Sequence, residues 1–295
     1  MRHRLLRARR AAQGTAVSHP RTPELLELAC EVAVAAGRLL LGRGGRTTVV
    51  ATKSSPTDVV TEADRAAETL IRERIGAARP GDRILGEEGG ETGTGSRVRW
   101  IVDPLDGTVN YLYGLPDWAV SIAAELDGDV VAGAVFVPRR DELFSAWRSR
   151  GAWLSWGALD WRGEDAPPPT RLACNTGVPL ARALVATGFG YASQRRLVQG
   201  KVLEAVLPRV RDIRRGGSAA VDLCSVASGS VDAYFERGVN LWDIAAGGLI
   251  AAEAGARVTG LHGRPASESM TLAAAPSLLG ELHDLLASTD PERDG

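Results

Sequence analysis

Four short segments of the sequence gather acidic residues where the chain is expected to change direction. They are TDVVTEAD (57–64), GEEGG (86–90), DPLDGTVN (103–110) and WDIAAG (242–247). Taken alone, each has an ordinary explanation: helix capping for the first, a solvated turn for Glu87 and Glu88, and a first-turn carboxylate for Asp243. Taken together, the four segments predict a site lined by carboxylates.

The segment DPLDGT is the most specific of the four. Asp103 follows the apolar run WIV, so it stands at the end of an expected strand, and Pro104 keeps it out of the helical region. Asp106 follows on a turn, and two converging carboxylates repel unless a cation lies between them. Oxygen ligands alone select a hard ion such as Mg²⁺. Because the N–H groups of Gly107 and Thr108 suit phosphate oxygens, the hexapeptide predicts metal-assisted phosphoryl chemistry.

The elements that must position these acids are mixed α and β. Apolar residues at helical spacing predict helices over about 22–42, 61–78, 194–207, 217–229, 242–254 and 276–287. Strands are expected at RILG and RWIV and near 171–175, 184–189 and 271–274. Alternating residues predict an antiparallel meander over 119–155, with turns at Asp127-Gly128 and Pro138.

The Pro- and charge-rich stretch 156–170 predicts a connection between two halves. We expect an N-terminal α+β half over 21–165 with most of the metal ligands. A C-terminal α/β half over 166–295 is expected to contribute Asp243 and the residues that recognise substrate. Residues 1–20 carry five arginines in the first ten positions without an apolar run, which predicts a disordered tail and not a secretory signal.

Composition excludes several classes of protein. Apolar residues make up 44% of the 295, enough for a core, and the formal net charge of −1 gives no reason to expect a nucleic acid or membrane partner. No stretch approaches the roughly 20 apolar residues of a membrane span. The three cysteines are widely spaced, so they predict neither disulfides nor a zinc pair, and we expect a reducing cytoplasm.

Five motifs in order make the sequence resemble the inositol monophosphatase family, the Mg²⁺-dependent, lithium-inhibited sugar phosphatases. They are KSSPTDVVTEAD, LGEEGG, WIVDPLDGTVNY, GSAAVDLCSVASG and YFERGVNLWDIAAGGLIAAEAGA, within about 25–286. The likeness is greatest to actinobacterial members. It implies a five-layer α-β-α-β-α sandwich, a homodimer, and two principal Mg²⁺ ions with a weaker third.

The resemblance also implies a role for each motif residue. Glu87, Asp103 and the backbone carbonyl of Leu105 hold the first ion; Asp103, Asp106 and Asp243 hold the second. Asp64 and Thr108 orient and deprotonate the attacking water, and the amides of Gly107 and Thr108 hold phosphate. Glu236 faces the substrate hydroxyls, the Gly217-Ser218-Ala219 turn lines the same side, and Lys53 lies near the metals.

The implied reaction is hydrolysis of a small phosphomonoester, myo-inositol 1-phosphate, without a covalent intermediate. Tyr191 stands where the family has a serine that contacts the polyol. Histidinol-phosphate, fructose-1,6-bisphosphate and 3′-phosphoadenosine 5′-phosphate phosphatases share the motifs and stay open as alternatives. So does a non-catalytic regulatory binding protein. Asp127-Gly128-Asp129 also fits the pattern of aspartyl-phosphate phosphatases, but Asp-Gly between alternating strands predicts a hairpin first.

Overall fold

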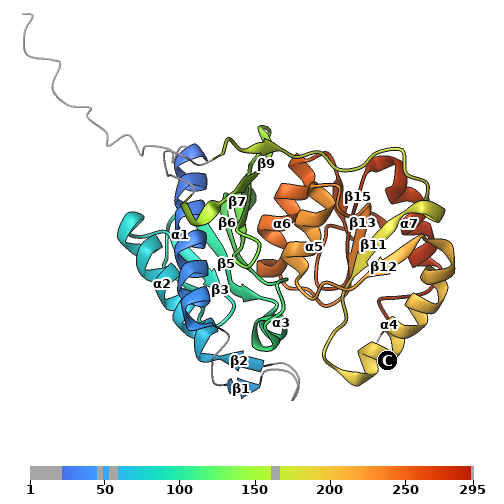
Figure 1. Ribbon diagram of the computed structural model, residues 1–295, viewed down its shortest axis with the longest axis horizontal. Coiled ribbons are helices and arrows are strands. Elements are labelled where there is room, and N and C mark those ends of the chain that lie inside the picture. The colour runs from blue at the N-terminus through green and yellow to red at the C-terminus, as the bar shows by residue number, and fades with distance from the viewer. Residues whose placement is uncertain (1–21, 45–48, 53–58, 161–166, 294–295) are drawn as a thin grey trace, which may run out of the picture.

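The computed structural model describes residues 22–44, 49–52, 59–160 and 167–293, without the side chains of 49–52, 59–60 and 160. The expected tail over 1–20 and Lys53 lie outside the described residues. Within the described ranges the chain forms five layers in the order helices, sheet, helices, sheet, helices (Figure 1). The expected mixed α/β sandwich is confirmed.

The first sheet has eight strands in the described part of the chain, and all neighbouring pairs except β3 and β5 are antiparallel. In spatial order they are β10 (Thr170–Arg171), β9 (Gly151–Trp156), β8 (Glu142–Trp147), β7 (Asp129–Val137), β6 (Ala119–Leu126), β5 (Val98–Asp106), β3 (Arg83–Gly86) and β4 (Gly90–Thr92). The predicted meander is confirmed. Asp127 and Gly128 both have positive φ, 54° and 91°, as a tight hairpin turn requires.

The second sheet, as far as the structure describes it, is mixed and five-stranded. Its order is β12 (Asp212–Arg214), β11 (Leu184–Thr187), β13 (Ala233–Glu236), β15 (Thr271–Ala274) and β14 (Arg257–Thr259). A separate pair joins β1 (Val49–Thr52) to β2 (Val59–Thr61). The strand expected over 171–175 is wrong beyond Arg171. The N–H of Leu172 still bonds to the carbonyl of Ala152 on β9, but the N–H of Cys174 bonds to the carbonyl of Ala254, which follows α6, so the chain has left the sheet by Cys174.

Helices form the other three layers (Figure 1). One outer layer holds α1 (Thr22–Arg43) and α2 (Glu62–Ala78), and the middle layer holds α5 (Ala219–Ala227) and α6 (Leu241–Glu253). The opposite outer layer holds α4 (Ser193–Val206) and α7 (Pro276–Ala287), and the short α3 (Thr108–Tyr113) follows β5. Short 3₁₀ turns cover Ala158–Asp160, Leu180–Arg182, Leu207–Arg209 and Leu261–Gly263.

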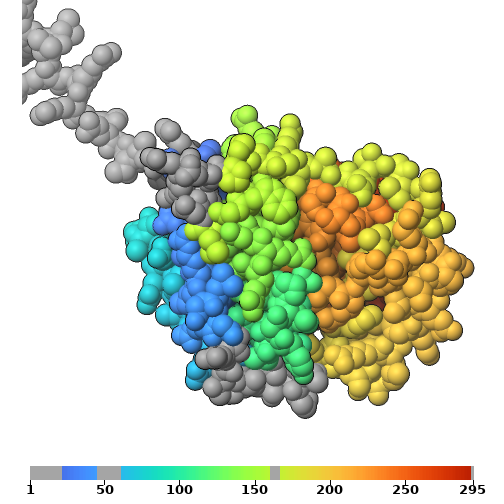
Figure 2. Space-filling model, viewed as in Figure 1, coloured from blue at the N-terminus to red at the C-terminus, as the bar shows by residue number. Residues whose placement is uncertain are grey.

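The core is divided into clusters that fill the spaces between the layers. On β6, Val120 and Ile122 pack toward α1, whereas Ala119 and Ala123 pack toward α5 and α6. Because both faces of the strand are covered, its sequence is nearly all apolar. Two further clusters lie on either side of the second sheet. Seen from outside, the earlier elements, blue to green, adjoin the later elements, yellow to orange (Figure 2). Within the described residues, no helix combines the length and apolarity needed to cross a bilayer.

Gly37 shows how closely α1 approaches the first sheet. An added Cβ there would lie 2.4 Å from Cδ1 of Phe136, which is fully buried. We expect Gly37→Ala to destabilise the fold by about 1–3 kcal/mol through overpacking, exceeding the roughly 1 kcal/mol that alanine gains in a helix. Urea unfolding measures the change. The matched control is Gly76→Ala on α2, where no atom lies within 4 Å and stability should rise. Equal effects at the two positions would contradict the packing account.

Candidate metal and phosphate site

Three carboxylates from two distant parts of the chain converge at the end of β5. Asp103 and Asp106 stand where β5 ends in an irregular register against β6, and Asp243 stands in the first turn of α6. Each offers one oxygen, and these oxygens all lie within 4.8 Å of one another. Asp103 is fully buried and the other two are half-buried. The structure therefore brings together three of the acids that the sequence analysis singled out.

The electrostatics of the cluster are unfavourable without a cation. Burial raises the pKa of Asp103 well above its ordinary value, and the charges of Glu87, Asp106 and Asp243 raise it further. Burial also raises the pKa of Asp243, followed by the charges of Asp106 and Glu87. Burial raises the pKa of Asp106 to about 6, against opposing hydrogen bonds from Ser218 and Ala220. A set of carboxylate oxygens under this mutual repulsion fits a hard divalent cation.

Glu87 and Leu105 lie beside this cluster. The N–H of Glu87 donates to the carbonyl of Val102 at 3.3 Å, which fixes the residue just past β3. Glu87 is close enough to raise the pKa of Asp103 and Asp243 but is outside the set within 4.8 Å. The N–H of Leu105 donates to Oδ1 of Asp103 at 2.9 Å. Its carbonyl accepts from the hydroxyl of Thr108 at 3.1 Å.

Asp64 and Thr108 meet across the sequence. The Thr108 hydroxyl lies 3.0 Å from Oδ1 of Asp64, to which it donates. Oδ2 of Asp64 accepts from the N–H of Thr61 at 2.9 Å and also from the Thr61 hydroxyl. This is the predicted capping box at the start of α2, and it leaves the fully buried Asp64 in one orientation.

Gly107 forms the tight turn between β5 and α3. Its φ is +89°, and an added Cβ would lie 2.9 Å from the carbonyl oxygen of Asp117 and 3.3 Å from that of Gly217. Only glycine takes this conformation at no steric cost. The turn brings Thr108 to the first position of α3, beside Asp64 and the acidic cluster.

Glu236 approaches the cluster from the second sheet, at the end of β13. Burial raises its pKa to about 7, the hydrogen bond from Tyr234 at 2.9 Å lowers it, and the charge of Asp106 raises it. A Cβ on Gly188 would lie 2.1 Å from both carboxylate oxygens, so the missing side chain of Gly188 makes room for Glu236. The Glu236 carboxylate is therefore close enough to the acidic cluster for the charge of Asp106 to act on it.

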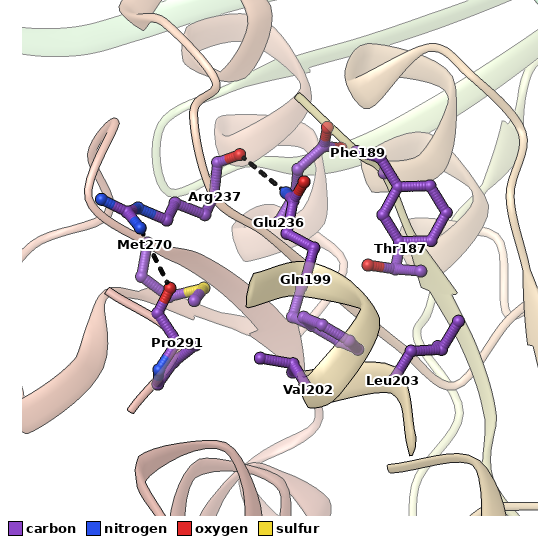
Figure 3. A pocket seen from close by; sticks show the side chains of 11 residues that line it. Thr187, Phe189, Gln199, Val202, Leu203, Glu236, Arg237, Met270 and Pro291 are labelled. Atoms are coloured by element: carbon purple, nitrogen blue, oxygen red, sulfur yellow. Dashed lines mark hydrogen bonds between the residues drawn. The ribbon is translucent and has the colours of Figure 1, made fainter. Parts of the chain in front are cut away.

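A small pocket lies behind Glu236 (Figure 3). Gln199 of α4 crosses it, accepting from the N–H of Gly190 at 3.0 Å and donating to the carbonyl of Arg237 at 3.4 Å. The Arg237 guanidinium reaches the carbonyl of Pro291 at 3.4 Å. These contacts join the segments on either side of Glu236 to α4 and to the C-terminal segment.

The turn Gly217-Ser218-Ala219 does more than its sequence indicated. Ser218 caps α5, and its hydroxyl donates to Oδ2 of Asp106 at 2.6 Å. The N–H of Ala220 donates to the same oxygen at 2.7 Å. Sequence reasoning missed this support for Asp106, although a serine before a helical run is a recognisable capping signal. It also missed Asp222, a buried acid that lies next to Gly216. Burial raises the pKa of Asp222 to about 8.

A five-layer fold with a cluster of carboxylates that could hold a cation is typical of a metal-dependent enzyme, and comparison with known proteins identifies the family. The family model described as the inositol monophosphatase family matches residues 22–292. The inositol-1-monophosphatase of Mycobacterium bovis is 49% identical over 239 residues, 79% of each chain. The Nus factor SuhB of Pasteurella multocida is 38% identical, covering 88% of this chain and 94% of its own. The solved structure of Mycobacterium tuberculosis SuhB matches with a TM-score of 0.77 and 42% identity, over 93% of this chain and all of that one.

The chain belongs to the inositol monophosphatase family. It is an enzyme of that family of metal-dependent phosphatases.

The raised pKa values predict how the metal-free protein responds to pH. A carboxyl group whose folded pKa exceeds its unfolded pKa stabilises the fold at low pH, and that contribution is lost as pH rises through the folded value. With Asp106 at about 6 and Glu236 at about 7, the melting temperature in EDTA should fall from pH 5 to pH 8. Saturating Mg²⁺ should offset most of the fall by neutralising the cluster. Parallel curves with and without Mg²⁺ would contradict the cation site.

Proposed function

We propose that the chain hydrolyses a small phosphomonoester in a Mg²⁺-dependent reaction, converting myo-inositol 1-phosphate and water to myo-inositol and phosphate. The observation that carries this proposal is the convergence of the Asp103, Asp106 and Asp243 oxygens within 4.8 Å. The name of the Mycobacterium bovis relative, inositol-1-monophosphatase, supports the choice of substrate.

Two principal ions, with a weaker third, are part of the proposal. Glu87, Asp103 and the carbonyl of Leu105 would hold one ion, and Asp103, Asp106 and Asp243 the other. Bound divalent ions supply Lewis-acid polarisation of phosphate oxygens and lower the pKa of water. Asp106 is prepared for this role because Ser218 and Ala220 fix one of its oxygens.

Asp64 and Thr108 would activate the attacking water. The Thr108 hydroxyl donates to Asp64 at 3.0 Å, so its oxygen can accept a proton from water as its own proton moves toward the carboxylate. The capping box holds Asp64 in the orientation that this transfer needs. Amide groups of Gly107 and Thr108 would orient the phosphate.

The bond changes balance without a covalent intermediate. The water oxygen forms the new bond to phosphorus as the bond from phosphorus to the inositol oxygen breaks. One proton leaves the water for the pair of Thr108 and Asp64, which later returns it to solvent, and the departing alkoxide takes up a proton from a solvent water. Glu236 and the Gly217-Ser218-Ala219 turn would bind the hydroxyls of the leaving group.

A phosphate-release assay with purified protein tests the proposal. Inositol 1-phosphate should be the best of four substrates, the others being histidinol phosphate, fructose 1,6-bisphosphate and 3′-phosphoadenosine 5′-phosphate. Millimolar lithium should inhibit the reaction. Release should stop in EDTA and return with Mg²⁺. If another of the four substrates is preferred, the chain would be assigned that substrate within the same family.

A regulatory role is the second candidate, because two relatives, from Pasteurella multocida and Xylella fastidiosa, bear the name Nus factor SuhB. No Mg²⁺-dependent release from any of the four substrates would favour that candidate. Assembly as a homodimer, a cytoplasmic location and the division into halves at 165 and 166 stay predictions.

Glu236 should separate substrate choice from chemistry. A carboxylate that accepts hydrogen bonds from sugar hydroxyls contributes roughly 1.5–3 kcal/mol, so Glu236→Gln should lower kcat/KM for inositol 1-phosphate about 10- to 100-fold. Hydrolysis of p-nitrophenyl phosphate, whose leaving group has no such hydroxyls, should fall much less. Glu281→Gln, an exposed acid on α7, is the matched control. Equal losses on both substrates would mean that Glu236 supports the metal site or the fold.

A further inference from the structure

The turn that carries Glu87 is held by a buried acid of α2. One carboxylate oxygen of Glu68 accepts from the N–H of Glu88 at 2.8 Å, and the other accepts from the N–H of Gly89, also at 2.8 Å. Glu68 is only 3% exposed. Its carboxylate thus satisfies the two backbone donors that directly follow Glu87.

Arg72 holds the same turn from its other side. Its Nε donates to Glu68 at 2.7 Å, its Nη2 to the carbonyl of Gly90 at 2.6 Å, and its Nη1 to the hydroxyl of Thr92 at 2.8 Å. The guanidinium therefore links α2 to β4, while Glu68 links α2 to the turn before it. The positive charge of Arg72 also compensates the buried negative charge of Glu68.

The glycines of the turn are explained by this contact. An added Cβ on Gly86 or on Gly89 would lie 2.7 Å from the Glu68 carboxylate. Neither residue has a positive φ, so close approach and not backbone conformation requires glycine there. The Glu68 carboxylate packs so closely against the turn that neither position has room for a side chain.

The same face of α2 reaches the centre of the site. Asp64, Glu68 and Arg72 are spaced four residues apart, which places them on one face of the helix. Asp64 contacts Thr108, and one turn later Glu68 contacts the turn that bears Glu87. One rigid helix thus connects the acid proposed to act on water with the acid proposed to hold metal.

We propose that Glu68 and Arg72 are positioning residues that clamp the Glu87 turn and so set the affinity of the site for its divalent cation. The inference rests on the proposed metal site, but not on which phosphomonoester is hydrolysed. Without the Glu68 carboxylate, two amides lose their acceptors and the Glu87 side chain is no longer held toward Asp103.

The test is Glu68→Gln, in which an –NH₂ group must face one of the two N–H donors. Isothermal titration of the full chain with Mg²⁺ alone should show binding weakened about 10- to 100-fold, the scale for residues that orient metal ligands. At saturating Mg²⁺, kcat should stay within about threefold. Glu73→Gln, an exposed acid on the same helix with the same charge change, should leave Mg²⁺ binding unaltered.

Gly89→Ala is the second variant, because its Cβ would push the Glu68 carboxylate away, and it should weaken Mg²⁺ binding in the same way. If Glu68→Gln fails to fold, the Mg²⁺ affinity of Gly89→Ala tests the inference instead. A lower melting temperature with unchanged Mg²⁺ affinity in the folded variants would overturn the inference and leave a purely structural role. Weakened Mg²⁺ binding in a protein that hydrolyses none of the substrates would refute the proposed function and support the clamp.

Discussion

Mutual repulsion among buried carboxylates is the constraint on which the arrangement of the site depends. Asp103, Asp106 and Asp243 bring their oxygens within 4.8 Å of one another in a region that burial has largely removed from water. Desolvation and like charge both favour the neutral acids, whereas metal binding requires the ionised form. The fold must therefore supply fixed positive partners that hold each oxygen in place until a cation completes the balance.

Helix N-termini supply such partners for Asp106, for Asp243 and for the neighbouring Asp64, whereas Asp103 accepts from the N–H of Leu105 at the end of β5. Asp64 accepts from the backbone at the start of α2, and Asp243 accepts from the N–H of Asn240 at the start of α6, at 2.6 Å. Asp106 accepts from Ala220 in the first turn of α5. Each N-terminus presents unpaired N–H groups and the positive end of a helix dipole, which stabilise a carboxylate. Three helices from two different layers thus each stabilise one of the acids that lie together at the site.

Local signals explain how much of this could be predicted from the sequence. An apolar strand that breaks at Pro104 predicts where Asp103 stands, and the pattern from Thr61 to Asp64 predicts a cap, because these depend on neighbours a few residues away. The support of Asp106 by Ser218 spans 112 positions, and that of Gly89 by Glu68 spans 21. Contacts between residues so far apart produce no periodic pattern in the sequence from which they could be predicted. The strand expected over 171–175 was overextended for a related reason: Cys174 is buried, but its backbone N–H bonds to Ala254 after α6 and not to a neighbouring strand.

The division of the core places the residues proposed for chemistry and those proposed for substrate recognition in different sheets. The candidate metal ligands follow β3, end β5 or begin α6, whereas Glu236 ends β13 of the second sheet and Gly188, which makes room for it, directly follows β11. The clusters that pack around the first sheet do not include the residues that support Glu236, which are Tyr234 from a different cluster and Gln199 from α4. Substitutions at the ends of β11 and β13 can therefore alter what contacts a leaving group while the acids on β5 keep their partners. If the proposed roles hold, a fold built this way can retain one set of metal ligands while its substrate contacts change.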